Sequence, residues 1–181
     1  MIVKETALKG CFEIEPSVFN DHRGYFLETF NQQAFNQAIG QEVTFVQDNE
    51  SQSTKGVLRG LHFQTGDHAQ AKLIRVVVGR VLDVVVDLRP NSPTFCKHFK
   101  AVLSGENKKQ LFVPRGFAHG FLVLSETAIF SYKCDNFYSK AAEAGIAYND
   151  PTLNIDWEFP TNLVELSKKD LHLPTIEAYF K

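Results

Sequence analysis

The chain has 181 residues, a length typical of one domain, which excludes a large multidomain assembly. We therefore expect a single domain over residues 1–181, large enough to fold around its own hydrophobic core. Its 19 Lys and Arg residues and 21 Asp and Glu residues give a net charge of -2 at pH 7, and neither sign forms a long block. This balance disfavours nucleic acid as a partner.

The cysteine pattern and the hydropathy indicate a cellular location. Cys11, Cys96 and Cys134 are an odd set without a C-x-x-C pair, which disfavours both a disulfide framework and a cysteine zinc site. The N-terminus is charged and lacks the apolar run of a signal peptide, and no apolar stretch is long enough to span a membrane. These features predict a cytoplasmic protein without a membrane partner.

In chain order, the first predicted element is a short helix over residues 32–39, capped by Asn31 and ended by Gly40. Short apolar runs separated by turn residues follow, and a high Phe content favours strands. After residue 139 the pattern loosens into loops and short helical turns. The sequence thus predicts an all-β sandwich or barrel with strands over residues 44–47, 56–64, 72–78, 81–88, 94–103, 110–113, 120–124 and 127–134.

The run over residues 57–64 contains the first candidate for chemistry. Strict alternation places His62 on an apolar face with Leu58, which is typical of a hydrogen-bonded core histidine, and Arg59 on the opposite face. Gly60 inside the run is typical of a β-bulge, which would bring Arg59 and His62 to one face.

Charged residues lie in the next two runs. Lys72 shares a face with core-type Ile74 and Val76, so it is either a lysine at the rim of the core or an electrophile that stabilises an oxyanion. Asp83 and Asp87 are typical of a solvated face or of partners for a nearby cation, which favours a supporting role.

The segment from Pro114 to Phe121 reads P-x-G-x-x-H and is similar to the second motif of the cupin superfamily, in which the histidine, here His119, points into a small β-barrel. Metal-binding cupins carry H-x-H and a following Glu in the first motif, whereas this chain has His62-Phe63-Gln64. A metal-free cupin is the expectation. A metal-dependent isomerase or dioxygenase using His62, His68 and His119 is the alternative.

Two further side chains have ordinary structural interpretations. Tyr132 shares a face with Ala128 and Phe130, as a buried core tyrosine would. Asp170 follows Ser167 in an S-x-x-D pattern, which is typical of a capping box.

Taken together, the motifs indicate a protein family far more specifically than any one of these residues does. The chain resembles the dTDP-4-dehydrorhamnose 3,5-epimerase family from about Ile2 to Asp170, in motif order and in spacing. The segments that carry the resemblance are residues 19–28, 45–49, 57–64, 72–75, 114–121 and 166–170, of which R-G-L-H-F-Q and P-x-G-F-A-H-G-F are the most specific.

This resemblance implies a cupin-type jelly-roll fold, a homodimer and no metal or organic cofactor. It implies inversion of C3 and C5 of dTDP-4-dehydro-6-deoxy-D-glucose on the route to dTDP-L-rhamnose, a deoxysugar of lipopolysaccharide and O-antigen. Both carbons adjoin the C4 ketone, so the chemistry requires a base, a cation for the enolate oxygen and an acid on the opposite sugar face.

The resemblance also implies roles for individual residues. His62 would be the base, oriented by Asp170; Lys72 would stabilise the enolate and Tyr132 would reprotonate it, with Asp83 and His119 in support. Substrate-binding positions would be Arg23 and Arg59 for the diphosphate and Phe26, Glu28, Gln47, Asn49 and Tyr138 for the thymidine.

The residues around Arg23 to Glu28 would reach the neighbouring subunit's site, and core packing is the less favoured alternative for Phe26 taken alone. Epimerases that invert only C3 or only C5 share these residues. A non-catalytic sugar-nucleotide-binding cupin is disfavoured, because His62, Tyr132 and Asp170 are all present.

Overall fold

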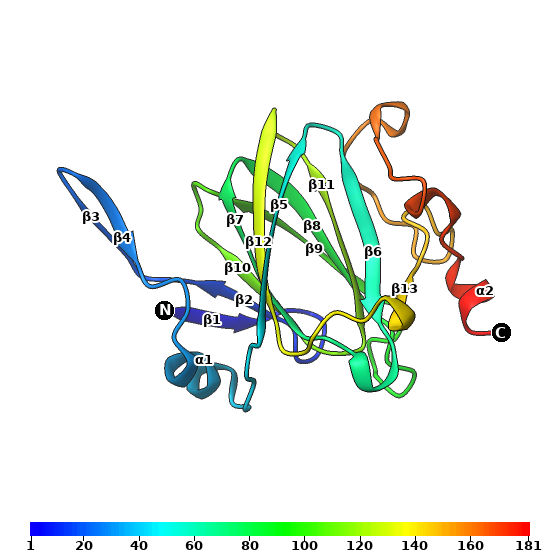
Figure 1. The fold of residues 1–181 in the computed structure, drawn as a ribbon, viewed down its shortest axis with the longest axis horizontal. Helices are drawn as coiled ribbons and strands as arrows, with labels where there is room; N and C mark the ends of the chain where they lie inside the picture. The colour runs from blue at the N-terminus through cyan, green and yellow to red at the C-terminus, as the bar shows by residue number, and fades with distance from the viewer.

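The computed structural model describes all residues, 1–181, and consists of two facing antiparallel sheets that form a barrel (Figure 1). One sheet has the order β1 (Ile2–Glu5), β2 (Phe12–Glu15), β10 (Gln110–Val113), β7 (Lys72–Val78), β12 (Thr127–Cys134), β5 (Gln47–Thr54). The other has the order β13 (Glu143–Gly145), β6 (Leu58–Gln64), β11 (Phe117–Val123), β8 (Arg80–Asp87), β9 (His98–Ser104). The predicted all-β class is confirmed.

The main core lies between the two sheets. Ile74 and Val76 of β7 face Val81 and Val85 of β8, and each of these side chains is at most 2% exposed. Alternation along each strand sends every second side chain inward. Lys72 is therefore on the inward face of β7, as predicted, at the end where the apolar packing stops.

Two smaller cores lie on the outer faces. Helix α1 (Gln32–Ile39) packs Phe35 and Ile39 against the six-stranded sheet. Its predicted caps are confirmed: the Asn31 side chain accepts a hydrogen bond from the Ala34 N–H, and Gly40 is left-handed with φ 70°. On the other side, the C-terminal tail packs Trp157 and other apolar residues against the five-stranded sheet.

The tail contains short 3₁₀ turns at Lys140–Ala142, Thr161–Leu163 and Asp170–His172, and ends in helix α2 (Ile176–Tyr179). This confirms the prediction of loops and short helical turns. Figure 1 shows the tail running along the outside of β6. No helix has both the length and the apolar character needed to cross a membrane.

Several strand predictions were wrong at their boundaries. The predicted strand over residues 44–47 ends where β5 begins, because the strand is a polar edge strand, QDNESQST, without an apolar signal. Strand β9 begins later than expected, at His98, and β11 begins earlier, at Phe117. The first four strands were not predicted, including the hairpin of β3 (Val18–Asp21) and β4 (Gly24–Leu27), which projects from the barrel (Figure 1).

Candidate active site

A bulge in β6 creates the site. His62 pairs with His119 of β11, but Arg59 pairs with Phe121, so the register shifts between them. Gly60 at the bulge has φ 134°, and a Cβ there would lie 2.5 Å from the Gly120 Cα, so only glycine fits. Arg59 and His62 consequently line the same cavity, as the bulge hypothesis predicted and strict alternation did not.

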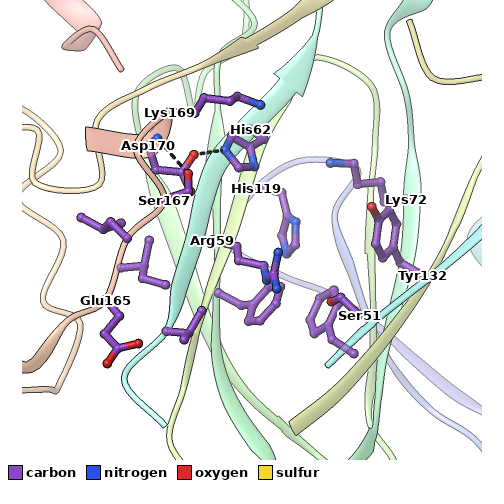
Figure 2. Close-up of a pocket in the computed structure, with 15 residues that line it drawn as sticks. Ser51, Arg59, His62, Lys72, His119, Tyr132, Glu165, Ser167, Lys169 and Asp170 are labelled. Atoms are coloured by element: carbon purple, nitrogen blue, oxygen red, sulfur yellow. Dashed lines mark hydrogen bonds and ion pairs between the residues drawn. The ribbon is translucent and has the colours of Figure 1, made fainter. Parts of the chain in front are cut away.

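The cavity has a volume of about 520 Å³ and is partly open to solvent. Its walls come from both sheets: His62 and His119 from the five-stranded sheet, and Lys72 and Tyr132 from the six-stranded sheet. Figure 2 shows His62 with Asp170 on one side of this space and Lys72 with Tyr132 on the other. A small molecule bound in the cavity would therefore have His62 facing one of its sides and Lys72 with Tyr132 facing the opposite side.

Asp170 approaches His62 from the C-terminal tail. Its Oδ1 lies 2.6 Å from His62 Nε2, and its Oδ2 accepts a hydrogen bond of 3.4 Å from the Gly60 N–H. Burial acts to raise the pKa of the Asp170 carboxyl, but the hydrogen bonds from His62 and Gly60 outweigh it and hold the pKa below its ordinary value. The Ser167 Oγ accepts a hydrogen bond from the Asp170 N–H, so the capping interaction exists beside the histidine contact.

A second histidine–aspartate pair lies deeper in the barrel. His119 Nε2 is 2.9 Å from Asp83 Oδ2, and the Asp83 Oδ1 is buried without a hydrogen-bond partner. Burial lowers the pKa of His119, although the negative charge and hydrogen bond of Asp83 act to raise it. The charges of Lys72 and His62 lower it further. The interpretation of Asp83 and Asp87 as a solvated face is wrong, since both are fully buried and Asp87 pairs with Arg89 outside the cavity.

Burial also sets the acidity of the two groups opposite His62. It lowers the pKa of the Lys72 ammonium, although the nearby carboxylates of Asp83 and Glu143 oppose the shift. It raises the pKa of the Tyr132 phenol, so this hydroxyl keeps its proton at neutral pH. The Lys72 Nζ lies 5.8 Å from the centre of the Tyr132 ring, within the range of a cation–π contact.

A smaller cavity of about 160 Å³ adjoins the first and shares His62, Lys72 and Tyr132 with it. Three predicted thymidine-binding residues meet here: the Gln47 side chain accepts from the Tyr138 N–H at 2.9 Å and donates to the Asn49 side chain at 3.0 Å. The structure thus brings these three together next to the cavity that holds His62.

The remaining predicted binding residues lie elsewhere in the chain. Arg23 is at the tip of the β3–β4 hairpin, where it pairs with Asp21, and Phe26 is on the hairpin with 69% of its surface exposed. Glu28, at the hairpin base, accepts a hydrogen bond from the Asn31 side chain. The structure does not bring these three into the chain's own cavity, and the alternative of core packing for Phe26 is wrong because the side chain is exposed.

Sequence reasoning missed two charged residues at the site. Lys169 lines the large cavity, and its ammonium pairs with Glu143, which lines the small one. The Tyr138 hydroxyl donates to the same Glu143 carboxylate at 3.2 Å. The position of Lys169, directly before Asp170, was the available signal, whereas nothing around Glu143 indicated its contact with Tyr138.

Cys11, Cys96 and His68 line neither cavity, whereas Cys134 borders the site, where its Sγ accepts a hydrogen bond of 3.7 Å from the Asn49 side chain. Burial raises the pKa of Cys11 to about 12 and that of Cys134 to about 11, so both thiols are protonated at neutral pH and are poor nucleophiles. His68 is in the 3₁₀ turn Gly66–His68 and lines neither cavity. No three His, Cys, Asp or Glu side chains are close enough together to hold a metal ion.

A cavity inside a jelly-roll barrel, with a histidine–aspartate pair on one wall and a lysine and a tyrosine on the other, is typical of an enzyme of the cupin class. The family model of the dTDP-4-dehydrorhamnose 3,5-epimerases matches residues 5–178. The chain therefore belongs to the dTDP-4-dehydrorhamnose 3,5-epimerase family, which confirms the resemblance found in its motifs.

Individual relatives agree with this assignment. The dTDP-4-dehydrorhamnose 3,5-epimerase of Salmonella typhimurium is 53% identical, over 98% of this chain and 96% of the relative. The crystal structure of the Elizabethkingia anophelis enzyme of that name is 56% identical, with a TM-score of 0.94 over 98% of this chain and 97% of that chain. A Legionella pneumophila epimerase in complex with dTDP-4-keto-L-rhamnose is 45% identical, with a TM-score of 0.94 over 97% of this chain and 93% of that chain.

Proposed function

We propose that the protein inverts C3 and C5 of dTDP-4-dehydro-6-deoxy-D-glucose and so forms dTDP-4-dehydro-L-rhamnose. The observation that carries this proposal is the placement of His62 with Asp170 across one cavity from Lys72 and Tyr132. The names of the relatives support the reaction, and the ligand of the Legionella pneumophila structure supports the sugar nucleotide. The product would serve dTDP-L-rhamnose synthesis, and through it lipopolysaccharide and O-antigen.

His62 is the base of the proposed mechanism. Because a carboxylate only accepts hydrogen bonds, neutral His62 donates its Nε2 proton to Asp170, which leaves the Nδ1 lone pair to accept a proton. His62 Nδ1 removes the proton from the carbon next to the ketone, and the electron pair of that C–H bond forms the enolate. Asp170 stabilises the imidazolium that results, as a carboxylate partner does in other histidine dyads.

Lys72 and Tyr132 complete the exchange from the other side of the cavity. The Lys72 ammonium stabilises the negative charge on the C4 oxygen, and its lowered pKa favours a strong hydrogen bond to that oxygen. Tyr132 donates its hydroxyl proton to the opposite face of the same carbon, which inverts the centre. Solvent then exchanges protons with both side chains, so the reaction consumes no cofactor.

His119, Asp83 and Arg59 have supporting roles. His119 and Asp83 fix the hydrogen-bond pattern beside His62, since their pair is buried next to it. Arg59 lines the cavity with its guanidinium, a group whose planar fork suits a diphosphate. Gln47, Asn49 and Tyr138 in the adjoining cavity hold the thymidine.

The proposal includes a homodimer in which each subunit completes its partner's site, and the hairpin residues support it. Phe19, Tyr25 and Phe26 are each more than half exposed on the projecting hairpin, which is unusual for large apolar side chains unless a partner covers them. Strand β5, which carries Gln47 and Asn49, is an edge strand that pairs only with β12. An arm from a second copy would bring Arg23, Phe26 and Glu28 to this edge.

Mixing two inactive variants tests the exchange of arms. Arg23→Ala and His62→Ala would each be inactive alone, but a mixed dimer contains one site with both residues intact. After subunits are mixed and re-equilibrated, we expect about a quarter of the native activity, because half of the dimers are mixed and each has one intact site. Light scattering measures the dimer, and failure of the mixture to recover activity would contradict the arm exchange.

Two further features complete the proposal: one domain over residues 1–181 and a cytoplasmic location. The family match over residues 5–178 and the core shared by both sheets support the single domain. The unpaired state of Cys11, Cys96 and Cys134 supports a reducing compartment.

Solvent deuterium uptake into dTDP-4-dehydro-6-deoxy-D-glucose, followed by proton NMR and mass spectrometry, tests the reaction. Uptake at both C3 and C5 would support the 3,5-epimerase, and uptake at one carbon would indicate an epimerase of C3 or C5 alone. Binding of dTDP without uptake would indicate a non-catalytic binding protein. A stoichiometric metal on which activity depends would contradict the metal-free mechanism.

A further inference from the structure

Asp170 belongs to a tail segment that is attached to the barrel only at intervals. At its near end, Glu165 exchanges backbone hydrogen bonds with β6 and the turn before it: the Leu58 N–H donates to Glu165 O, and the Glu165 N–H donates to Gly56 O, both at 2.9 Å. Asp170 itself adds only side-chain and capping contacts. Beside Asp170, the ion pair of Lys169 with Glu143 of β13 adds an exposed contact, so the position of the carboxylate depends largely on how the far end of the segment is held.

Asp150 holds that far end. It is 2% exposed, and its two oxygens have different partners. Oδ1 accepts hydrogen bonds from the N–H groups of Thr152 and Leu153, both at 2.8 Å, and so closes its own turn. Oδ2 accepts a bond of 2.7 Å from the Ile176 N–H at the start of α2.

The stretch of chain that leads into the turn of Asp150 is hydrogen-bonded to β6, the strand that carries His62. Ile146 exchanges two backbone hydrogen bonds, of 2.9 and 3.2 Å, with Leu61, the residue before His62. Gly145 pairs with His62 itself. On its other side the same stretch contacts the tail: the Ala147 N–H donates a hydrogen bond of 2.8 Å to Pro174 O. One short stretch thus connects the strand of His62 to the segment of Asp170.

We propose that Asp150 is a positioning residue for the His62–Asp170 pair, an inference that rests on the proposed role of Asp170 in the epimerase reaction. The Oδ2 bond to Ile176 clamps the tail so that Asp170 stays within hydrogen-bond distance of His62. A displacement of about 1 Å would break the 2.6 Å hydrogen bond between Asp170 and His62, and misplacement on this scale is enough to lower the rate of catalysis. Asp150 lines neither cavity, so it acts only through the tail.

Asp150→Asn tests the clamp, because the amide oxygen can replace Oδ1 while the amide nitrogen cannot accept from Ile176. We expect kcat to fall about tenfold with KM within about twofold of native. The acid limb of the kcat/KM profile should move in the same direction as in Asp170→Asn. In the Asp170→Asn background, Asp150→Asn should lower kcat less than about twofold further, since the contact it protects is already lost.

Two other variants separate positioning from general destabilisation. Ile176→Pro removes the same hydrogen bond from the donor side, at a first helical position that accepts proline, and should reproduce the kcat loss. Asp87→Asn is the matched control: this carboxylate is equally buried and holds Arg89, Ser92 and Thr94 outside the cavity, so it should lower the melting temperature without changing kcat.

Equal losses from Asp150→Asn in both backgrounds, or a native kcat in the single variant, would overturn the inference. Failure of the proposed function is distinguishable, because the native protein would then show no epimerase activity, whereas a native rate in Asp170→Asn would overturn only the role of Asp170.

Discussion

The barrel contains two histidine–aspartate pairs that differ in setting. His62 and Asp170 are 108 residues apart, and the His62 side chain is 28% exposed to the cavity. His119 and Asp83 lie on the adjacent strands β11 and β8, and their side chains are 8% and 0% exposed. The contact distances, 2.6 and 2.9 Å, are similar.

The difference shows that pairing alone does not identify a catalytic base. The Asp170 carboxylate accepts hydrogen bonds on both oxygens, so its charge is compensated and its pKa is lowered. Asp83 has one oxygen without a partner, and its histidine has a pKa lowered by burial. The outer pair can exchange protons with a ligand, whereas the inner pair holds a neutral imidazole in place.

The largest expected effect separates the two histidines. His62→Gln keeps an amide donor near Asp170 but removes the base, so kcat should fall by roughly 10³- to 10⁴-fold, near the upper range for general base catalysis. Deuterium uptake at C3 and C5, followed by NMR, measures the loss. A variant within tenfold of native would assign the base elsewhere, with His119 as the first candidate.

Removing the charge from each aspartate sharpens the comparison. Asp170→Asn should lower kcat by about 10²-fold because the imidazolium loses its counter-charge, whereas Asp83→Asn should cost less than about tenfold because neutral His119 needs none. Steady-state rates of both variants with the same substrate measure the contrast. Equal losses would mean that the two pairs share the catalytic role.

Tyr132→Phe should separate proton removal from inversion. Without the phenol, His62 still removes the proton and returns deuterium to the same face, so exchange should continue while inversion falls by tens of fold. The ratio of deuterium in recovered substrate to deuterium in product measures this partition. If exchange and inversion fell together, Tyr132 would also contribute to forming the enolate.

The smallest effect concerns stability against pH. The folded-state pKa of His119 is lowered, so below the unfolded value of about 6.5 the unfolded chain binds the extra proton and stability falls with falling pH. The slope is at most about 1.4 kcal/mol per pH unit for one group. Asp170 and Asp87 have lowered pKa values too, so they destabilise the fold only below about pH 4.

Urea unfolding of the native protein and of His119→Gln, at several pH values between 5 and 7.5, measures this contribution. The variant should show a flatter dependence in this range. His98→Gln is the control for the other histidine whose pKa burial lowers. An unchanged slope in His119→Gln would mean that His119 is protonated in the folded protein.

Local chemistry made part of the fold predictable. Helix α1 matches the prediction from Asn31 to Gly40 because its caps act within a single turn. Strand β12 matches at both ends because its buried side chains alternate with more exposed ones, as expected of a half-buried strand. Strand β10 matches because a short continuous apolar run bounded by polar residues is typical of a fully buried strand. Strand β5 and the β3–β4 hairpin were missed because their polar or exposed faces pack against little of this chain.

The sequence by itself determined the fold class and the family, and it predicted which residues carry chemistry, because motifs and periodicity are local properties of a chain. Only the tertiary structure decided that Arg59 joins His62 through the Gly60 bulge, that Asp83 is buried and that Lys169 meets Glu143. The contact of Asp170 with His62 was implied by the family resemblance, and the tertiary structure shows its geometry. The physical reason is that these contacts depend on how distant segments pack, and a burial or a register shift leaves no periodic signal in the residues themselves.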